Sequence, residues 1–107
     1  MRKFSDKELE LAPQVAEAMF PDGPHVARYV PRDFLHEYIQ VNLLEHDCLE
    51  FLRGRENVST IEMVVFSGPI VDVCVYDFDG RLLAHARVPT LLEALYRVIV
   101  EGGAANA

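Results

Sequence analysis

The dipeptide Asp79-Gly80, which lies between two alternating apolar segments, constrains the fold of this chain more than any other sequence feature. Glycine adopts the positive φ angles of a two-residue type I′ turn, so the dipeptide predicts a hairpin that joins strands at 70–78 and 81–88. Its expected cross-strand pairs are Tyr76 with Leu83, Val75 with Ala84, Cys74 with His85, Val73 with Ala86, Asp72 with Arg87, and Val71 with Val88. One face of the hairpin is then entirely apolar and must be covered.

Two capping boxes mark the starts of helices. The side chains of Ser5 and Thr90 can each accept a hydrogen bond from the amide three residues later, and the glutamates there, Glu8 and Glu93, can reach back. Apolar residues after each box recur at helical spacing. Pro13 falls inside the first helix and removes a backbone hydrogen bond, so we expect a kink or a new helix start at this residue.

A further apolar stripe predicts a helix between these two. It forms one helix or a helix interrupted near Asn42, because the residues around Asn42 also alternate as they would in a strand. Gly54 and Gly102 are the expected ends of the second and third helices. The predicted helices span residues 5–20, 32–53 and 90–101.

These elements predict one α+β domain built in two layers. A strand over residues 60–66 precedes the hairpin and is joined to it by a turn at Gly68, so it adds apolar side chains to the covered face. Those side chains are Ile61, Met63 and Val65. The expected order is α-α-β-β-β-α, a three-stranded antiparallel meander with helices packed on one face, over residues 1–101. Residues 102–107 are expected to form a flexible C-terminal tail.

The second face of the sheet mixes apolar and charged side chains, as protein interfaces do. The alternative is that another segment of this chain, such as residues 25–31, covers that face. The residues expected to bind a partner protein are Glu62, Val64, Phe66, Asp72, Tyr76, Leu83, His85 and Arg87, of which Phe66, Tyr76, Leu83 and Arg87 are the expected anchors.

One row across this face carries reactive side-chain types. With the expected register, Glu62, Cys74 and His85 lie side by side on the three strands, about 5 Å apart. A cysteine beside a histidine can form an activated thiolate that a carboxylate orients, and the same three side chains can hold a transition metal. A partly buried thiol with polar neighbours accounts for the same pattern without any function.

The segment 77–80, with the sequence DFDG after an apolar strand, resembles the first motif of the haloacid dehalogenase-type phosphohydrolases. The resemblance implies a nucleophile at Asp77 and a general acid/base at Asp79. It covers residues 73–82 and departs at Arg81, where the family has Thr or Val. The family motif opens a large parallel sheet, whereas an antiparallel hairpin accounts for these residues, so we expect a turn here and no catalytic site.

Charge and cysteine content limit the partners and the location of the chain. A net charge of −7 opposes contact with a phosphate backbone, so we expect no direct nucleic-acid binding. Cys48 and Cys74 lie in no paired cysteine motif, which fits a reducing compartment and the absence of a metal or other cofactor. The N-terminal segment lacks the apolar run of a secretory signal, and no apolar run would span a membrane, so we expect a cytoplasmic chain without a membrane partner.

These observations favour a non-enzymatic, acidic protein-interaction module: an inhibitor, an immunity or antitoxin-like protein, or an accessory subunit. It is expected to bind a partner protein with a basic surface through the mixed sheet face, steered by the acidic stretch at residues 31–62. Three alternatives remain. They are a nucleic-acid mimic that inhibits a nucleic-acid-binding protein, a small enzyme or metal-binding protein that uses Glu62, Cys74 and His85, and a homodimer whose sheet faces pack together.

Overall fold

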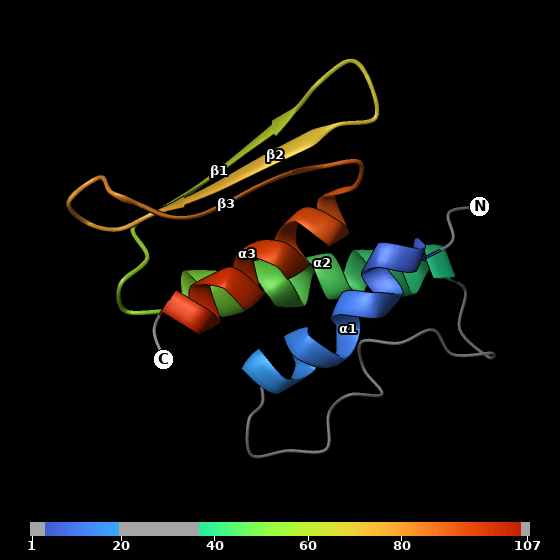
Figure 1. Ribbon diagram of the computed structural model, residues 1–107, viewed down its shortest axis with the longest axis horizontal. Helices are drawn as coiled ribbons and strands as arrows, with labels where there is room; N and C mark the ends of the chain where they lie inside the picture. Colours follow the sequence, from blue (N-terminus) through green and yellow to red (C-terminus); the bar gives the residue numbers. More distant parts are fainter. Residues whose placement is uncertain (1–3, 20–36, 106–107) are drawn as a thin grey trace.

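The α+β order expected from the sequence is confirmed by a computed structural model, which describes residues 4–19 and 37–105. The elements are α1 (Asp6–Met19), α2 (Glu37–Arg53), β1 (Thr60–Val65), β2 (Val71–Tyr76), β3 (Leu82–Val88) and α3 (Leu91–Ala105). The strands form one antiparallel meander in the order β1-β2-β3. All three helices lie on the same side of this sheet (Figure 1).

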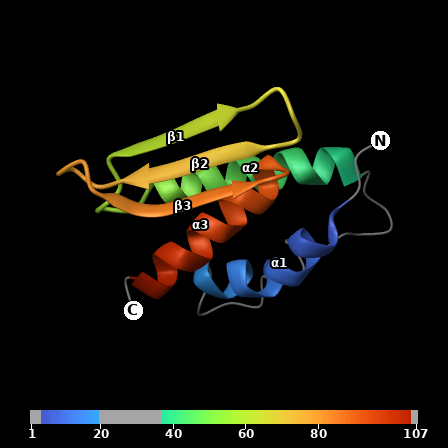
Figure 2. The same cartoon turned by 45° about the horizontal axis from the view of Figure 1, so that its top comes forward.

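The helical layer covers the apolar face of the hairpin. α3 lies against β2 and β3, α2 lies beside α3, and α1 packs against α3 at a greater distance from the sheet (Figures 1 and 2). The small side chains of Ala84 and Ala86 let α3 approach β3 closely, and both are buried. The buried strand residues are Val71, Val73, Val75, Ala84 and Ala86. No helix in the described part of the chain is both long and apolar enough to cross a membrane.

The two predicted capping boxes meet at one buried carboxyl group. Ser5 N donates to Glu8 Oε1 (2.8 Å) and Glu8 N donates to Ser5 Oγ (3.1 Å), which confirms the box of α1. Thr90 Oγ1 donates to the other carboxyl oxygen of Glu8 (2.7 Å) and accepts from Glu93 N (3.2 Å). The fully buried Glu8 side chain therefore links the first turn of α1 to the first turn of α3.

The helix ends agree only partly with the prediction. α1 continues through Pro13 as one helix, and its ribbon bends along its length (Figure 1). α2 runs without interruption through Asn42 and ends before Gly54, while the predicted start at residue 32 lies outside the described residues. The expectation that Gly102 ends the third helix is wrong, because α3 continues to Ala105. Glycine lowers helix stability by about 1 kcal/mol without forbidding the conformation.

The strand registers agree with the expected rows except at one end of the hairpin. On β1, Glu62 pairs with Cys74, as expected. The confirmed hairpin pairs are Val75 with Ala84, Cys74 with His85, Val73 with Ala86, Asp72 with Arg87, and Val71 with Val88. Tyr76, however, pairs with Leu82 and not with Leu83, because the register shifts between Val75 and Tyr76. Such a shift is a β-bulge, in which one strand carries an extra residue.

The predicted two-residue turn is also wrong, because the hairpin loop holds three residues, 78–80. Asp77 N donates to Arg81 O (2.9 Å), and Gly80 N donates to Asp77 O (3.1 Å). Gly80, with φ of 78°, is the one residue with positive φ in the described part of the chain. The Asp77 carboxylate accepts from the amides of Asp79 and Arg81, both at 2.9 Å, so this aspartate holds the turn together.

The helical layer leaves β1 uncovered, which corrects the expectation for Ile61, Met63 and Val65. Their pairing with β2 places them on the same side of the sheet as the buried valines. Ile61 is partly buried, but Met63 is 45% exposed and Val65 is 76% exposed. The reason is the position of the helices, since α3 lies against β2 and β3.

Candidate functional site

The face of the sheet opposite the helices, here called the open face, is built from three strands in register. Its side chains form cross-strand rows because partners in an antiparallel pair project to the same side. The rows are Thr60–Tyr76–Leu82, Glu62–Cys74–His85 and Val64–Asp72–Arg87, with Phe66 beyond the last row. The expected row of Glu62, Cys74 and His85 is thus confirmed as a row.

Three polar side chains of this face come close together along a diagonal between two adjacent rows. His85 Nε2 is hydrogen-bonded to Asp72 Oδ1, although the two residues belong to adjacent rows. One ligand-type atom of each of Asp72, Cys74 and His85 lies within 4.8 Å of the other two. The structure therefore brings Asp72, and not Glu62, together with the cysteine and the histidine.

This cluster is partly open to solvent and is surrounded by polar groups. The side chain of His85 is 43% exposed and that of Asp72 is 22% exposed. Cys74 is a free, half-buried thiol. A hydrogen bond and then an electrostatic interaction with the Cys74 side chain raise the pKa of the Tyr76 phenol, with smaller contributions from burial, Glu62 and Asp72. Tyr76 therefore interacts with this cluster through Cys74.

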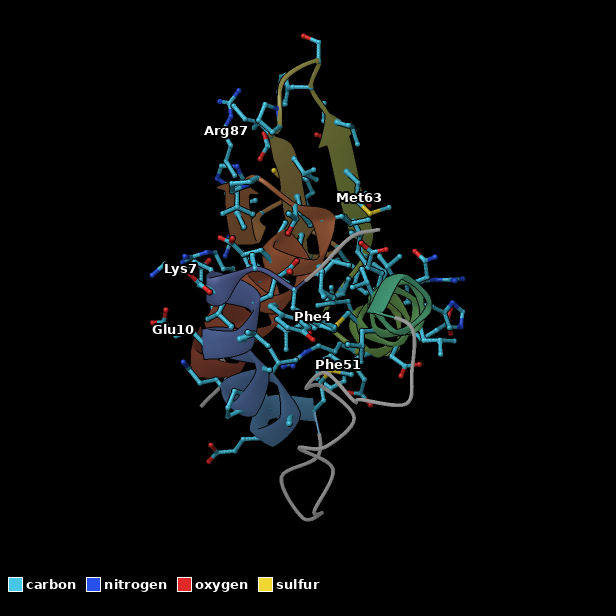
Figure 3. The ribbon with its side chains drawn as sticks, turned by 90° about the vertical axis from the view of Figure 1, so that its right-hand side faces the viewer. Phe4, Lys7, Glu10, Phe51, Met63 and Arg87 are labelled. Carbon is cyan, nitrogen blue, oxygen red and sulfur yellow. The ribbon has the colours of Figure 1, made fainter. Side chains whose placement is uncertain are left out.

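An aromatic contact occupies one end of the open face. The guanidinium carbon of Arg87 lies 4.7 Å from the centroid of the Phe66 ring, which is a cation–π distance. This contact passes across β2, from β3 to the end of β1. Both residues were expected among the anchors, and the structure brings them together. In Figure 3, Arg87 and Met63 lie at the two outer strands of the sheet, β3 and β1, whereas Phe4 and Phe51 lie among the helices.

One expected anchor does not belong to the open face. Leu83 packs against the core and lines a cavity of about 20 Å³ together with Val75 and Val98. The bulge places Leu82 opposite Tyr76, and Leu82 is 53% exposed. Leu82 therefore takes the position on the open face that Leu83 was expected to have.

The exposed strand β1 is a feature that the sequence analysis missed. Apolar side chains on both of its faces are exposed, and the residues that follow the strand add two more. They are Met63, Val64, Val65, Phe66 and Ile70. An exposed edge strand with several apolar side chains invites pairing with another chain, and natural edge strands are often protected by charges or prolines, of which β1 carries one, Glu62. Sequence alternation located the strand but gave no information about which strand the helices would cover.

A groove of about 590 Å³ runs between α2 and β1. Its wall on α2 carries both polar and apolar side chains. The lining residues are His46, Leu49, Glu50 and Arg53 of α2, residues 58–61, and Met63. Arg53 and Glu50 form an exposed ion pair at 3.0 Å along this wall. The groove lies on the helix side of β1, so it adjoins the exposed strand.

Residues 25–31, the alternative cover for the open face, lie outside the described residues. No protein-family model, curated protein or solved structure matches this chain.

Proposed function

We propose that this chain is a non-enzymatic protein-interaction module that binds an extended segment of a partner protein at β1. The segment adds to the sheet as a fourth strand, antiparallel or parallel to β1. The observation that carries the proposal is the exposure of β1, an edge strand with apolar side chains exposed on both faces. Strand addition satisfies the backbone groups of such an edge and buries its apolar side chains at the same time.

The backbone of β1 offers hydrogen-bonding groups for this mode of binding. Phe66 N donates to Ile70 O, which points that amide toward the rest of the sheet. Inward-pointing amides recur at every second residue of an antiparallel strand. The amides of Ile61, Met63 and Val65 therefore point outward, where an added strand can accept their hydrogen bonds.

The surroundings of β1 indicate the chemistry of the partner. Residues 37–65 carry six carboxylate side chains and two arginines, a net charge of −4. Alternate side chains of an added strand face the groove between α2 and β1, while the others extend the open face near Val64 and Phe66. A partner segment with apolar residues at alternate positions and Lys or Arg between or beside them complements both features.

A proline substitution tests the strand addition directly. Met63→Pro removes an outward-pointing amide and leaves the β1–β2 hydrogen bonds in place, because the Met63 amide takes no part in them. Met63→Leu is the matched control, since it keeps the amide and a similar apolar volume. We expect the wild type and Met63→Leu to capture the same stoichiometric protein from lysate of the source cell at about 50 mM salt, and Met63→Pro to lose it.

Two results would contradict this proposal. Equal capture by Met63→Pro and the wild type would show that the edge of β1 is not paired with the partner. Failure of the wild type to capture any stoichiometric protein, with light scattering that shows a concentration-dependent dimer, would assign the exposed strand to a second copy of this chain.

We further propose that the chain works in a reducing compartment, the cytoplasm. Both Cys48 and Cys74 are free thiols. A free, partly exposed thiol such as Cys74 fits a compartment that keeps cysteines reduced. Detection of the chain by fractionation and immunoblotting in an extracytoplasmic fraction would refute this assignment.

A further inference from the structure

The cluster on the open face carries an inference that is independent of partner binding. It contains a carboxylate, a thiol and an imidazole, from Asp72, Cys74 and His85, within 4.8 Å of one another. Asp72 and Cys74 are alternate residues of β2, and His85 lies beside Cys74 on β3. Strands hold their side chains in more definite positions than loops, so the three groups face one another on a stable scaffold.

We propose that Asp72, Cys74 and His85 bind one divalent transition-metal ion of the zinc class. Zinc accepts sulfur, nitrogen and oxygen ligands, with bond lengths of about 2.0–2.3 Å that place tetrahedral ligands about 3.5 Å apart. The three groups therefore need only side-chain rotations to converge on an ion. Calcium and magnesium are disfavoured, because these hard cations take oxygen ligands and not a thiolate or an imidazole.

The geometry also indicates the character of the site. Three protein ligands leave one tetrahedral position open. The side chain of His85 is 43% exposed, so solvent reaches the cluster. A hydrogen bond joins two of the proposed ligand atoms, His85 Nε2 and Asp72 Oδ1. Metal binding replaces this hydrogen bond and requires the thiol to give up its proton.

Cobalt(II) is the probe that reports the ligands, because a thiolate bound to cobalt gives a charge-transfer absorption in the near ultraviolet. We expect untagged, reduced full-length chain to bind one equivalent of Co²⁺ with this band, and Zn²⁺ to displace it. Cys74→Ser abolishes the band. His85→Ala and Asp72→Asn each weaken Co²⁺ binding by at least about tenfold, since even groups that only orient metal ligands cost about 10–100-fold when removed.

Three control variants identify the site. Cys48→Ala retains the band, because Cys48 is buried in the core away from the open face. His46→Ala, on the exposed surface of α2, retains the affinity. Glu62→Gln has a smaller effect than Asp72→Asn, because the cluster contains Asp72. A larger loss from Glu62→Gln would overturn the ligand set.

A second measurement does not depend on cobalt. Zn²⁺ binds the folded chain at this site, so it raises the melting temperature of the wild type and not that of Cys74→Ser. Circular dichroism confirms that each variant is folded, which is expected because all three ligands lie on the open face. Absence of the charge-transfer band in the wild type, or its retention in Cys74→Ser, would overturn the proposal and leave the Asp72–His85 hydrogen bond as a structural contact only.

Discussion

Glu8 joins parts of the chain that are distant in sequence. Its buried carboxyl group accepts hydrogen bonds from Ser5 N and from Thr90 Oγ1, which caps α3. Thr90→Val keeps the side-chain shape but removes the donor to Glu8 and the acceptor for Glu93 N. We expect a loss of about 2 kcal/mol in the free energy of unfolding, measured by urea denaturation.

Thr90→Ser is the control for that measurement, because it keeps the hydroxyl group. Its expected cost is below about 0.5 kcal/mol. If Thr90→Val destabilises the chain no more than Thr90→Ser does, the hydroxyl group and its hydrogen bonds to Glu8 and Glu93 contribute nothing measurable to stability.

Cys48 makes stability depend on pH in the alkaline range. Burial, and then the charges of Asp47 and Glu45, raise the pKa of its thiol well above the ordinary value of 9.0. Above pH 9 the unfolded chain has lost this proton while the folded chain keeps it, so the unfolded state binds fewer protons. Below pH 9 the Cys48 thiol makes a constant contribution to the free energy of unfolding. Above pH 9 the free energy of unfolding falls by up to about 1.4 kcal/mol per pH unit because of this thiol.

Cys48→Ala isolates this effect from other groups that titrate at high pH. Urea denaturation of both proteins between about pH 8 and pH 10.5 should show a steeper decline for the wild type. Parallel declines would mean that the Cys48 thiol ionises equally well in the folded and unfolded states.

Side-chain clustering on the open face was predictable only in part. Strand periodicity and the hairpin placed Glu62, Cys74 and His85 in one row, and the structure confirms that row. Asp72 reaches His85 along a diagonal, and such contacts depend on strand twist and side-chain torsions, which residue pairing does not determine.

Among the elements, the hairpin shows where glycine is required. Gly80 has φ of 78°, and a Cβ there would meet nothing within 4 Å, so the cost of a side chain comes from the backbone alone. Gly68 also has free space around it and has no positive φ. We expect Gly80→Ala to cost about 1–2 kcal/mol in urea denaturation.

Gly68→Ala is the matched control, expected to change stability by less than about 0.5 kcal/mol. Equal effects of the two substitutions would mean that the positive φ of Gly80 does not determine the stability of the turn.

The bulge of β3 could not be found from the sequence pattern. A two-residue and a three-residue loop differ by one position, and alternation normally decides between them. Leu82 and Leu83 are identical, so either can face the core without changing the apolar pattern. Beyond this pair, Ala84 and His85 differ in polarity, and there the register was predicted correctly.

At the scale of the whole molecule, the position of the helices determines which strands of the sheet are covered and which remain exposed for binding. Alternation predicted that Ile61, Met63 and Val65 would join the covered face, but it cannot say how far a helical layer extends sideways. α3 lies against β2 and β3, so β1 remains exposed and borders the groove beside α2. The fold class was therefore predictable from the sequence. The exposure of β1 was not, because it depends on where the helices pack on the sheet.

The charge of the molecule gives a separate prediction for partner binding. The net charge of −7 and the acidic stretch at residues 37–65 attract a basic partner over distances limited by salt. We expect the association rate to fall by about tenfold or more between about 50 mM and 500 mM salt, measured by surface plasmon resonance, with a smaller change in the dissociation rate. A salt-independent association rate would contradict electrostatic steering.

Hydrogen exchange at the outward-pointing amides of β1 tests the central claim most directly. In the free chain, the amides of Met63 and Val65 should exchange rapidly, because no strand pairs with that edge in the described structure. In the purified complex with the captured partner, the account predicts strong protection of these two amides. Protection confined to the rest of the open face or to the helices, with Met63 and Val65 still exchanging rapidly, would contradict binding by strand addition.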